Sequence, residues 1–172
     1  YHHLEENPDT QNQLIISPDR FKEHMAKLKE AGYESIFFKD LVAYVEGKRD
    51  LPEKPILITF DDGYLSNYLY AYPILKELNM KATISVIGWS VGETKYKGTD
   101  RDIIPHFTWE QGREMYRSGH IDIQNHSYDM HDIEIEGQPY RKGALQREDE
   151  TFAEYVKNFK EDLTKNKELI ES

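Results

Sequence analysis

One apolar run decides the fold of this chain: Ile56-Leu57-Ile58-Thr59-Phe60-Asp61-Asp62-Gly63-Tyr64, which ends in two carboxylates and a glycine. Such an unbroken run is typical of a strand buried on both faces, as in a parallel sheet covered by helices. Ligands gather at the carboxyl ends of such strands, where Asp61 and Asp62 lie. Neighbouring strand residues point to opposite sides, so the two carboxylates can take different roles. Taken alone, Asp61-Asp62-Gly63 is more typical of a turn and a helix cap.

A second polar segment follows a short alternating strand and reads Ile121-Asp122-Ile123-Gln124-Asn125-His126-Ser127-Tyr128-Asp129-Met130-His131. His126 and His131 are five positions apart, which matches neither one face of a helix nor one face of a strand. They can therefore converge only in a loop or an irregular turn. Two histidines and a carboxylate are a recurrent transition-metal ligand set that leaves positions open for water and substrate. The alternative is two ordinary surface or core histidines that never meet.

Together, Thr59-Phe60-Asp61-Asp62-Gly63 and His126-Ser127-Tyr128-Asp129-Met130-His131 resemble the first two motifs of the polysaccharide deacetylase family, also called the NodB-homology or carbohydrate esterase family 4 domain. The resemblance implies that Asp61 is the general base. It also implies that Asp62, His126 and His131 hold one divalent metal ion, most often zinc, with cobalt, nickel or iron as alternatives. The wide histidine spacing is similar to the branch that deacetylates poly-β-1,6-N-acetylglucosamine.

The start of the chain also resembles that branch, whose barrel is circularly permuted relative to other deacetylases. Tyr1-His2-His3-Leu4 is similar to the segment that opens it. The resemblance implies that His2 is the catalytic acid and that it faces the metal from the side opposite Asp61. A tag remnant or a frayed terminus is the alternative, since chain ends are ordered mainly where a sheet holds them.

One departure from the family concerns its third and fourth motifs, which do not occur in residues 1–172. Gln138-Pro139-Tyr140-Arg141 is similar to the third motif but follows His131 too soon. The chain, at 172 residues, is also short of the roughly 250 of a full (β/α) barrel. We therefore expect one deacetylase domain over 1–172. Its fold class is α/β, a distorted (β/α) barrel of deacetylase type, incomplete at the C-terminus.

The composition excludes several classes of binding partner. A formal net charge of −10 argues against nucleic acid and anionic membranes, which call for basic patches. The absence of cysteine excludes disulfides and thiolate metal sites, and no stretch is apolar enough over a sufficient length to span a bilayer. The resemblance implies a polysaccharide substrate and an extracellular or cell-surface location. The oligomeric state is left open.

Local signals predict the order of the elements. Ser17-Pro18 begins a helix that Gly32 ends, and Asp40 caps another with Val42 and Val45 facing inward. Strand 82–87 completes a β-α-β unit with the strand that ends at Asp61. Capping boxes at Thr108 and Thr151 begin two more helices, the last with an apolar stripe.

Two irregular segments are expected near the site. The loop 88–107 leaves the same end of the sheet and carries Trp89, and loops of this length are commonly functional. We expect Trp89 and Tyr128 to contact substrate, with ordinary aromatic packing as the alternative. The polar segment 132–148 reads as an insertion near the site.

The sequence thus predicts a metal-dependent hydrolase that removes N-acetyl groups from a β-linked N-acetylglucosamine polymer, such as biofilm poly-N-acetylglucosamine, peptidoglycan or a chitin-like chain. Asp61 would take a proton from the metal-bound water, and protonated His2 would give one to the leaving amine. Four alternatives stay open: an O-acetyl esterase of xylan type, a non-haem iron oxygenase, a magnesium phosphoryl-transfer enzyme, and a non-catalytic carbohydrate-binding relic.

Overall fold

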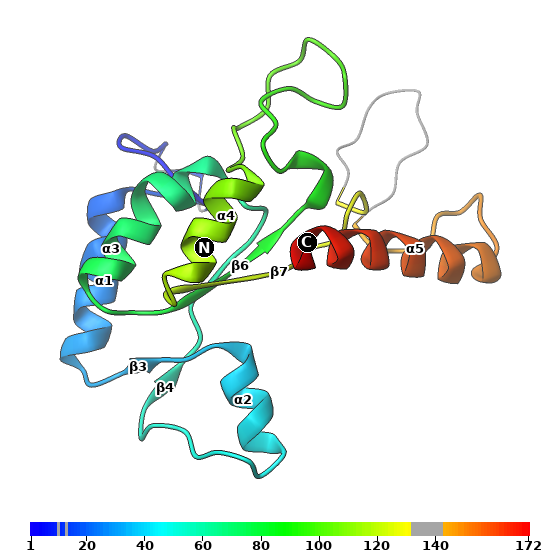
Figure 1. Ribbon diagram of the computed structural model, residues 1–172. Coiled ribbons are helices and arrows are strands. Elements are labelled where there is room, and N and C mark those ends of the chain that lie inside the picture. The colour runs from blue at the N-terminus through cyan, green and yellow to red at the C-terminus, as the bar shows by residue number, and fades with distance from the viewer. Residues whose placement is uncertain (10, 13, 132–142) are drawn as a thin grey trace.

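Short parallel strands alternate with helices along the chain (Figure 1). The computed structural model describes residues 1–9, 11–12, 14–131 and 143–172. The elements are β1 (His3–Leu4), β2 (Ile15–Ile16), α1 (Pro18–Glu30), β3 (Glu34–Ser35), α2 (Phe38–Val45), β4 (Pro55–Ile56), β5 (Thr59–Phe60), the π-helical turn η1 (Asn67–Ala71), α3 (Tyr72–Glu77), β6 (Ala82–Val86), the 3-10 turn η2 (Gly88–Ser90), α4 (Trp109–Arg117), β7 (Ile121–Asn125) and α5 (Phe152–Glu171). This order is the α/β architecture that the sequence predicted.

The central sheet has the order β5-β6-β7, and its strands are all parallel. Phe60 pairs with Ile84, and Ile84 pairs in turn with Ile123. The carboxyl ends of these strands therefore lie at one edge, where Asp61 and His126 follow β5 and β7. Two smaller parallel sheets, β1-β2 and β3-β4, flank this sheet, and the described strands do not close into a complete barrel.

The apolar run 56–60 differs from the single strand that its sequence predicts. Its first part, β4, pairs with β3, and its second part, β5, pairs with β6. The change of partner occurs because β3 ends at Ser35 and the chain turns into α2. After this change of partner, the Thr83 amide donates to the Ile58 carbonyl at 2.9 Å, and this bond joins the apolar run to β6.

Helix starts agree with the predicted caps at three places. Ser17 accepts from the Arg20 amide at 3.2 Å, and Thr108 and Thr151 each form a complete capping box. The prediction for α2 is wrong in two respects, because Phe37 is its N-cap and its valines face solvent. Asp40 lies in the first turn and accepts from the Phe37 amide at 3.0 Å.

The valines of α2 are exposed because of where the helix lies. Val42 is 54% exposed and Val45 is 77% exposed. Figure 1 shows α2 beside β3 and β4, away from the central strands that carry the core. The small two-stranded sheet therefore leaves this apolar side of the helix uncovered.

The core lies between the central sheet and the group formed by α1, α3 and α4, while α5 is set apart next to the end of β7 (Figure 1). Its fully buried members include Phe21, Met25, Phe60, Leu75, Ile84, Phe107, Met115 and Ile121. These side chains fix the strands whose ends carry the polar site.

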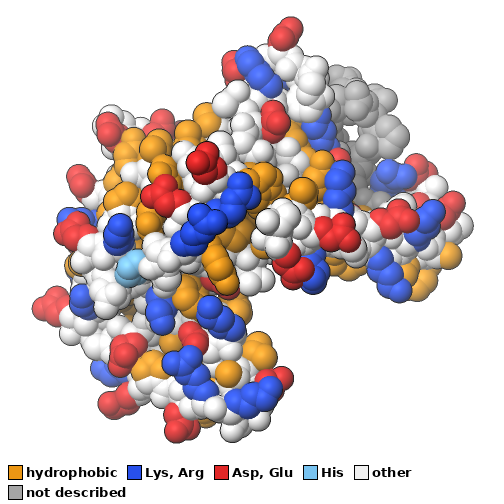
Figure 2. All heavy atoms as spheres, viewed as in Figure 1, with side chains coloured by type: hydrophobic (Ala, Val, Ile, Leu, Met, Phe, Trp, Pro, Cys, Tyr) orange, Lys and Arg blue, Asp and Glu red, His pale blue; other side chains and the backbone are white. Residues whose placement is uncertain are grey.

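The surface mixes acidic, basic and apolar side chains over the face shown in Figure 2. A cavity of about 700 Å³ lies between α4, β7 and α5, with Trp109, Tyr116, Asp122 and Leu163 among its lining residues. In the described ranges, no helix combines the length and apolarity needed to cross a membrane. The resemblance to a third motif at 138–141, and residues 132–142 of the predicted insertion, lie outside the described residues.

Candidate metal centre and active site

The two aspartates that follow β5 differ in exposure, and Asp62 lies in the left-handed region with φ +74° rather than in the strand. The side chain of Asp61 is 37% exposed, whereas that of Asp62 is only 8% exposed. Gly63 follows with φ +83°, and a Cβ there would lie 2.9 Å from Val86 Cγ1. Glycine is therefore needed for the chain to leave β5 against the end of β6. This close contact between Gly63 and Val86 holds Asp62 in its buried position at the carboxyl ends of the strands.

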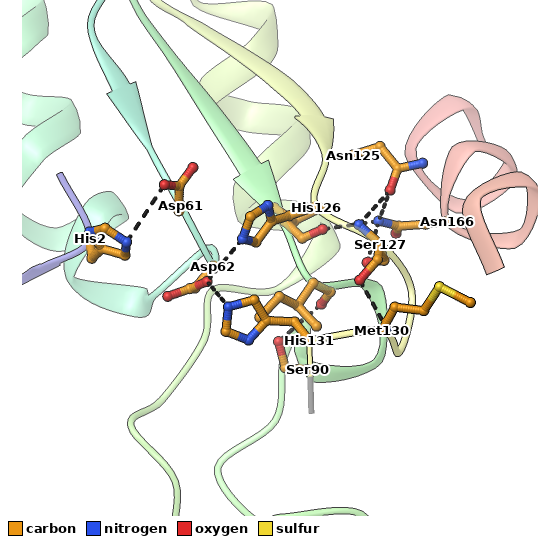
Figure 3. A network of polar contacts seen from close by, with 12 residues as sticks. His2, Asp61, Asp62, Ser90, Asn125, His126, Ser127, Met130, His131 and Asn166 are labelled. Atoms are coloured by element: carbon orange, nitrogen blue, oxygen red, sulfur yellow. Dashed lines mark hydrogen bonds and ion pairs between the residues drawn. The ribbon is translucent and has the colours of Figure 1, made fainter. Parts of the chain in front are cut away.

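Three side chains from two strand exits converge in Figure 3. Asp62 Oδ1 lies 3.5 Å from His126 Nε2 and 3.9 Å from His131 Nε2. One ligand atom from each residue lies within 4.8 Å of the other two. The predicted metal ligands are thus brought together by β5 and by the turn after β7.

The geometry and the donors fit a divalent transition metal. Two donors at about 2.1 Å from a tetrahedral zinc ion would be roughly 3.4 Å apart, close to the observed separations from Asp62. Asp62 Oδ1 is buried and has no hydrogen-bond partner. An unpaired buried carboxylate oxygen is costly, and a cation between the three groups would satisfy it. Two imidazoles with one carboxylate suit zinc, iron, cobalt or nickel better than magnesium.

An irregular turn brings the two histidines together. The His126 amide donates to the Val86 carbonyl at 3.0 Å, which continues the sheet by one residue. Ser127 then adopts φ +71°, in the left-handed region that is unfavourable for a residue with a Cβ. This reversal is why residues five positions apart, which share no regular face, place their rings 5.2 Å apart.

His2 lies beside Asp61 rather than across from it, so the expected geometry of this residue is wrong. His2 Nε2 is 3.6 Å from Asp61 Oδ2. The Tyr1 nitrogen donates to the Thr59 carbonyl at 2.9 Å, and the Asp61 amide donates to the Tyr1 carbonyl at 3.0 Å. Because the first residues run along β5, the side chain of His2 emerges next to the aspartate that ends this strand. Its role as the acid stays a prediction.

Tyr64 hydrogen-bonds to Asp62, and His106 packs against Tyr64. Neither residue was predicted as a site residue. Burial, followed by the charge and hydrogen bond of Asp62, raises the pKa of the Tyr64 phenol, which therefore stays protonated. The His106 ring lies 4.9 Å from that of Tyr64. Burial lowers the pKa of His106 to about 4, so its imidazole is neutral at pH 7. The sequence shows both residues, but only the antiparallel bridge between them brings them to the site.

Of the two predicted substrate residues, Tyr128 lies in the turn between His126 and His131, and Trp89 lies beside it, with its amide donating to the Tyr128 carbonyl. Trp89 packs edge-on against Tyr96, with ring centroids 5.4 Å apart, and Lys97 Nζ lies 5.2 Å from the Trp89 ring centre. Lys165 Nζ lies 3.5 Å from the ring centre of Tyr128. These contacts are protein packing, and contact with a sugar stays a prediction for both residues.

The fold and the site together define an α/β protein in which an aspartate and two histidines that could hold a metal ion meet at the carboxyl ends of parallel strands. Residues 48–172 match the family model described as polysaccharide deacetylase, and the chain belongs to this family. The family resemblance found in the sequence is thereby confirmed.

Individual relatives are similar over most of this chain. It is 38% identical over 126 residues to a Bacillus subtilis (strain 168) protein named "Putative polysaccharide deacetylase YxkH", covering 73% of this chain and 40% of the relative. It is 29% identical over 136 residues to the poly-beta-1,6-N-acetyl-D-glucosamine N-deacetylase of Escherichia coli (strain K12), covering 76% and 20%. The chain therefore spans less than half of the length of either relative.

A solved structure agrees with the fold prediction. The de-N-acetylase from Aggregatibacter actinomycetemcomitans superposes with a TM-score of 0.82 at 25% sequence identity. The match covers 99% of this chain and 71% of the other. The prediction of a deacetylase-type α/β fold is confirmed, and this chain covers about seven tenths of that structure.

Proposed function

We propose that this chain carries the catalytic centre of a metal-dependent hydrolase that removes N-acetyl groups from a β-linked N-acetylglucosamine polymer. The observation that carries the proposal is the convergence of Asp62, His126 and His131 next to a second, outward-facing carboxylate, Asp61. Family membership and the name of the Escherichia coli relative support the substrate class, with poly-β-1,6-N-acetylglucosamine as the first candidate polymer.

The roles follow from where each group lies. A divalent metal, most simply zinc, bound by Asp62, His126 and His131 would polarise the acetyl carbonyl and lower the pKa of a bound water. Asp61 is free of that ligand set and open to solvent, so its carboxylate accepts the proton of the attacking water. The amine product leaves poorly unless it is protonated. His2, beside Asp61, is the residue that would supply this proton.

The competing classes fit the centre less well. An oxygenase with two histidines and one carboxylate has no use for Asp61 beside the ligand set. A magnesium phosphoryl-transfer centre would take oxygen ligands rather than the imidazoles of His126 and His131. An O-acetyl esterase would use the same groups, so the choice between amide and ester substrates rests on the assay.

Substrate contacts and location complete the proposal. Tyr128 lies between the two histidines in sequence and its carbonyl accepts from the Trp89 amide, and we assign both residues to the sugar units that flank the reacting one. Because the substrate is an exported polymer in this proposal, the enzyme acts outside the cell or at its surface. Loss of amine release from the polymer, with retained release from a single N-acetylglucosamine unit, is expected for Trp89→Ala.

Paired substitutions test the roles of the two aspartates. In the natural full-length protein, Asp61→Asn should keep its metal and lose on the order of 10²–10⁴ in the rate of amine release from poly-β-1,6-N-acetylglucosamine oligomers. Asp62→Asn should lose the metal itself, measured by elemental analysis. The matched control is Asp100→Asn, an exposed carboxylate on the loop 88–107, which should change neither.

The same assay separates the alternatives. A metal-loaded protein that releases no amine from any N-acetylglucosamine polymer would contradict the proposed function and favour the binding relic. Acetate released from O-acetylated xylan alone would identify an esterase. Equal metal loss from the two aspartate variants would show that their roles are assigned wrongly.

A further inference from the structure

We propose that Asn166 and Asp162 of α5 are positioning residues that hold the histidine turn, residues 126–131, in the shape that binds metal. Neither residue belongs to the ligand set, and both lie more than thirty positions from the turn in sequence. The inference rests on the proposed function in so far as His126 and His131 are the ligands. It assigns to the last described helix a part in metal binding.

Asn166 is completely buried and its amide group joins the turn to the central sheet (Figure 3). Its Nδ2 donates to the Val86 carbonyl at 2.9 Å, to Asn125 Oδ1 at 2.8 Å and to the Ser127 carbonyl at 2.8 Å. Val86 ends β6 and Asn125 ends β7, so one side chain ties two strand ends to the turn that follows them.

The orientation of the Asn166 amide is fixed by its neighbours. Asn125 Nδ2 donates to the Leu163 carbonyl at 2.9 Å, and Asn125 Oδ1 accepts from the Ser127 amide at 2.8 Å. The Asn166 amide therefore faces three oxygen acceptors, and only its NH₂ group can point toward them. Reversing the amide would set an oxygen against these three oxygens.

Asp162 holds the middle of the turn, one helical turn before Asn166 on the same face of α5. Its Oδ1 accepts from the Tyr128 amide at 2.7 Å and its Oδ2 accepts from the Asp129 amide at 2.6 Å. Bonds from backbone amides to a carboxylate are about twice as strong as bonds between neutral groups. Both oxygens of one carboxylate are thus committed to the segment between the two histidines.

The backbone amides of residues 126–130 in the turn are all satisfied, and α5 supplies the acceptors for two of them. The His126 amide bonds to Val86, the Ser127 amide to Asn125, and the Met130 amide to Ser127 Oγ at 3.1 Å. The remaining two, those of Tyr128 and Asp129, bond to Asp162. Because Ser127 is in the left-handed region, the turn needs such external bonds to keep its shape.

Gly88 makes room for this arrangement. A Cβ at residue 88 would lie 2.3 Å from Asn166 Oδ1 and 2.8 Å from Tyr128 Cδ2. In turn, the amides of Gly88 and Trp89 donate to the carbonyls of Ser127 and Tyr128, both at 3.0 Å. The turn is therefore held between η2 on one side and α5 on the other.

The burial pattern of α5 points to a positioning role in addition to packing. Asn166 is the buried residue of this 20-residue helix, whereas Leu163 and Ile170 are only partly buried. A helix that only covered the sheet would bury an apolar residue at this central position. Here the most buried position carries the side chain that bonds to the turn.

The test compares Asn166→Asp and Asp162→Asn with two controls on the same helix, Asn158→Asp and Glu161→Gln. Asn166→Asp keeps the shape but removes the donors and sets a carboxylate against two carbonyls. Asp162→Asn keeps one acceptor and places an NH₂ group against a backbone amide. Asn158 Nδ2 donates to Glu150 Oε2 at 3.2 Å, away from the turn, and the side chain of Glu161 is 66% exposed.

Two properties of each purified full-length variant are measured. The first is its affinity for Zn²⁺, and the second is the visible absorption spectrum of its Co²⁺ form. We expect affinity to fall about 10–100-fold in Asn166→Asp and Asp162→Asn, with a changed cobalt spectrum. Amide hydrogen exchange at residues 126–130 should accelerate in both. The controls should bind metal within about twofold of the unsubstituted protein and keep its spectrum.

The outcomes separate this inference from the proposed function. Unchanged metal affinity and an unchanged cobalt spectrum in folded Asn166→Asp and Asp162→Asn would overturn the inference. If Asn166→Asp does not fold, the half-buried Asp162→Asn decides alone. Weakened metal binding in these variants supports the inference even if no polymer is deacetylated. An unsubstituted protein that binds no divalent metal would overturn both proposals.

Discussion

Replacing Gly63 by alanine tests the packing that directs Asp62 into the metal centre. Two separate costs are expected. The first is conformational, because φ +83° is unfavourable for any residue with a Cβ, by about 1–2 kcal/mol. The second is steric, because the new Cβ would lie 2.9 Å from Val86 Cγ1, in a part of the core that is fully buried. Overpacking of this kind costs about 1–3 kcal/mol.

Gly47→Ala is the matched control, because it isolates the first cost. Gly47 has φ +69°, and a Cβ there would meet nothing within 4 Å. The free energy of unfolding should therefore fall by about 1–2 kcal/mol in Gly47→Ala and by about 2–5 kcal/mol in Gly63→Ala. Urea unfolding followed by circular dichroism, with a chelator present so that bound metal adds nothing, measures both.

The test lies in the difference between the losses of unfolding free energy in Gly63→Ala and Gly47→Ala. Equal losses would mean that Val86 moves aside without cost, and the exit of β5 would then not be fixed against β6 as described. A larger loss in Gly63→Ala, together with weaker metal binding that Gly47→Ala does not show, would link this close packing to the placement of Asp62.

Three further predictions follow from other parts of the structure. His2→Ala should depress N-deacetylation of glucosamine oligomers much more than hydrolysis of an activated aryl acetate, whereas equal losses in the two assays would indicate that His2 only orients Asp61. The pKa of His106 is about 4 in the folded state against 6.5 in the unfolded state, so below pH 6.5 the unfolded state binds a proton that the folded state does not. The free energy of unfolding should therefore fall by about 3 kcal/mol as the pH drops from 6.5 to 4. In His106→Phe this part of the pH dependence of urea unfolding should disappear, and an unchanged dependence would refute the assignment. Among the described residues β7 ends the central sheet, so the 172 residues alone should self-associate through the edge of β7 and the neighbouring cavity, and a clean monomer in light scattering would refute this prediction.

Local patterns in the sequence were sufficient for the parts of the site that depend on local geometry. Alternation along a strand led to the prediction that Asp61 and Asp62 diverge; their exposures do differ, but Asp62 has φ +74°, so a turn and not a strand separates them. The five-residue spacing of His126 and His131 predicted an irregular turn, and the turn has one residue in the left-handed region. The helix caps at Ser17 and Thr108 were likewise predicted, because capping depends only on neighbouring residues.

Features set by the path of the chain in space could not be predicted in this way. His2 lies next to Asp61 because the first residues pair with β5, and nothing in the sequence near His2 specifies that pairing. Val42 and Val45 have the spacing of an inward face, yet the sheet beside α2 is too small to cover them.

The sequence of the last helix contains a signal for its contact with the histidine turn. Asn166 interrupts the apolar stripe of the last helix, between Leu163 and Ile170 at helical spacing, and Asp162 lies four positions before it. A polar residue in such a stripe is buried against a partner or it disrupts the packing. The partner, the turn at 126–131, lies far away in the sequence and is visible only in the fold.

The most direct test of the account is a crystal of the zinc-loaded protein measured on both sides of the zinc absorption edge. We predict one anomalous peak, within about 2.0–2.2 Å of an Asp62 oxygen and of Nε2 of His126 and His131, with Asp61 outside the coordination shell. A peak held by other residues, a peak that includes Asp61, or no peak between these three side chains at saturating zinc would contradict the central claim.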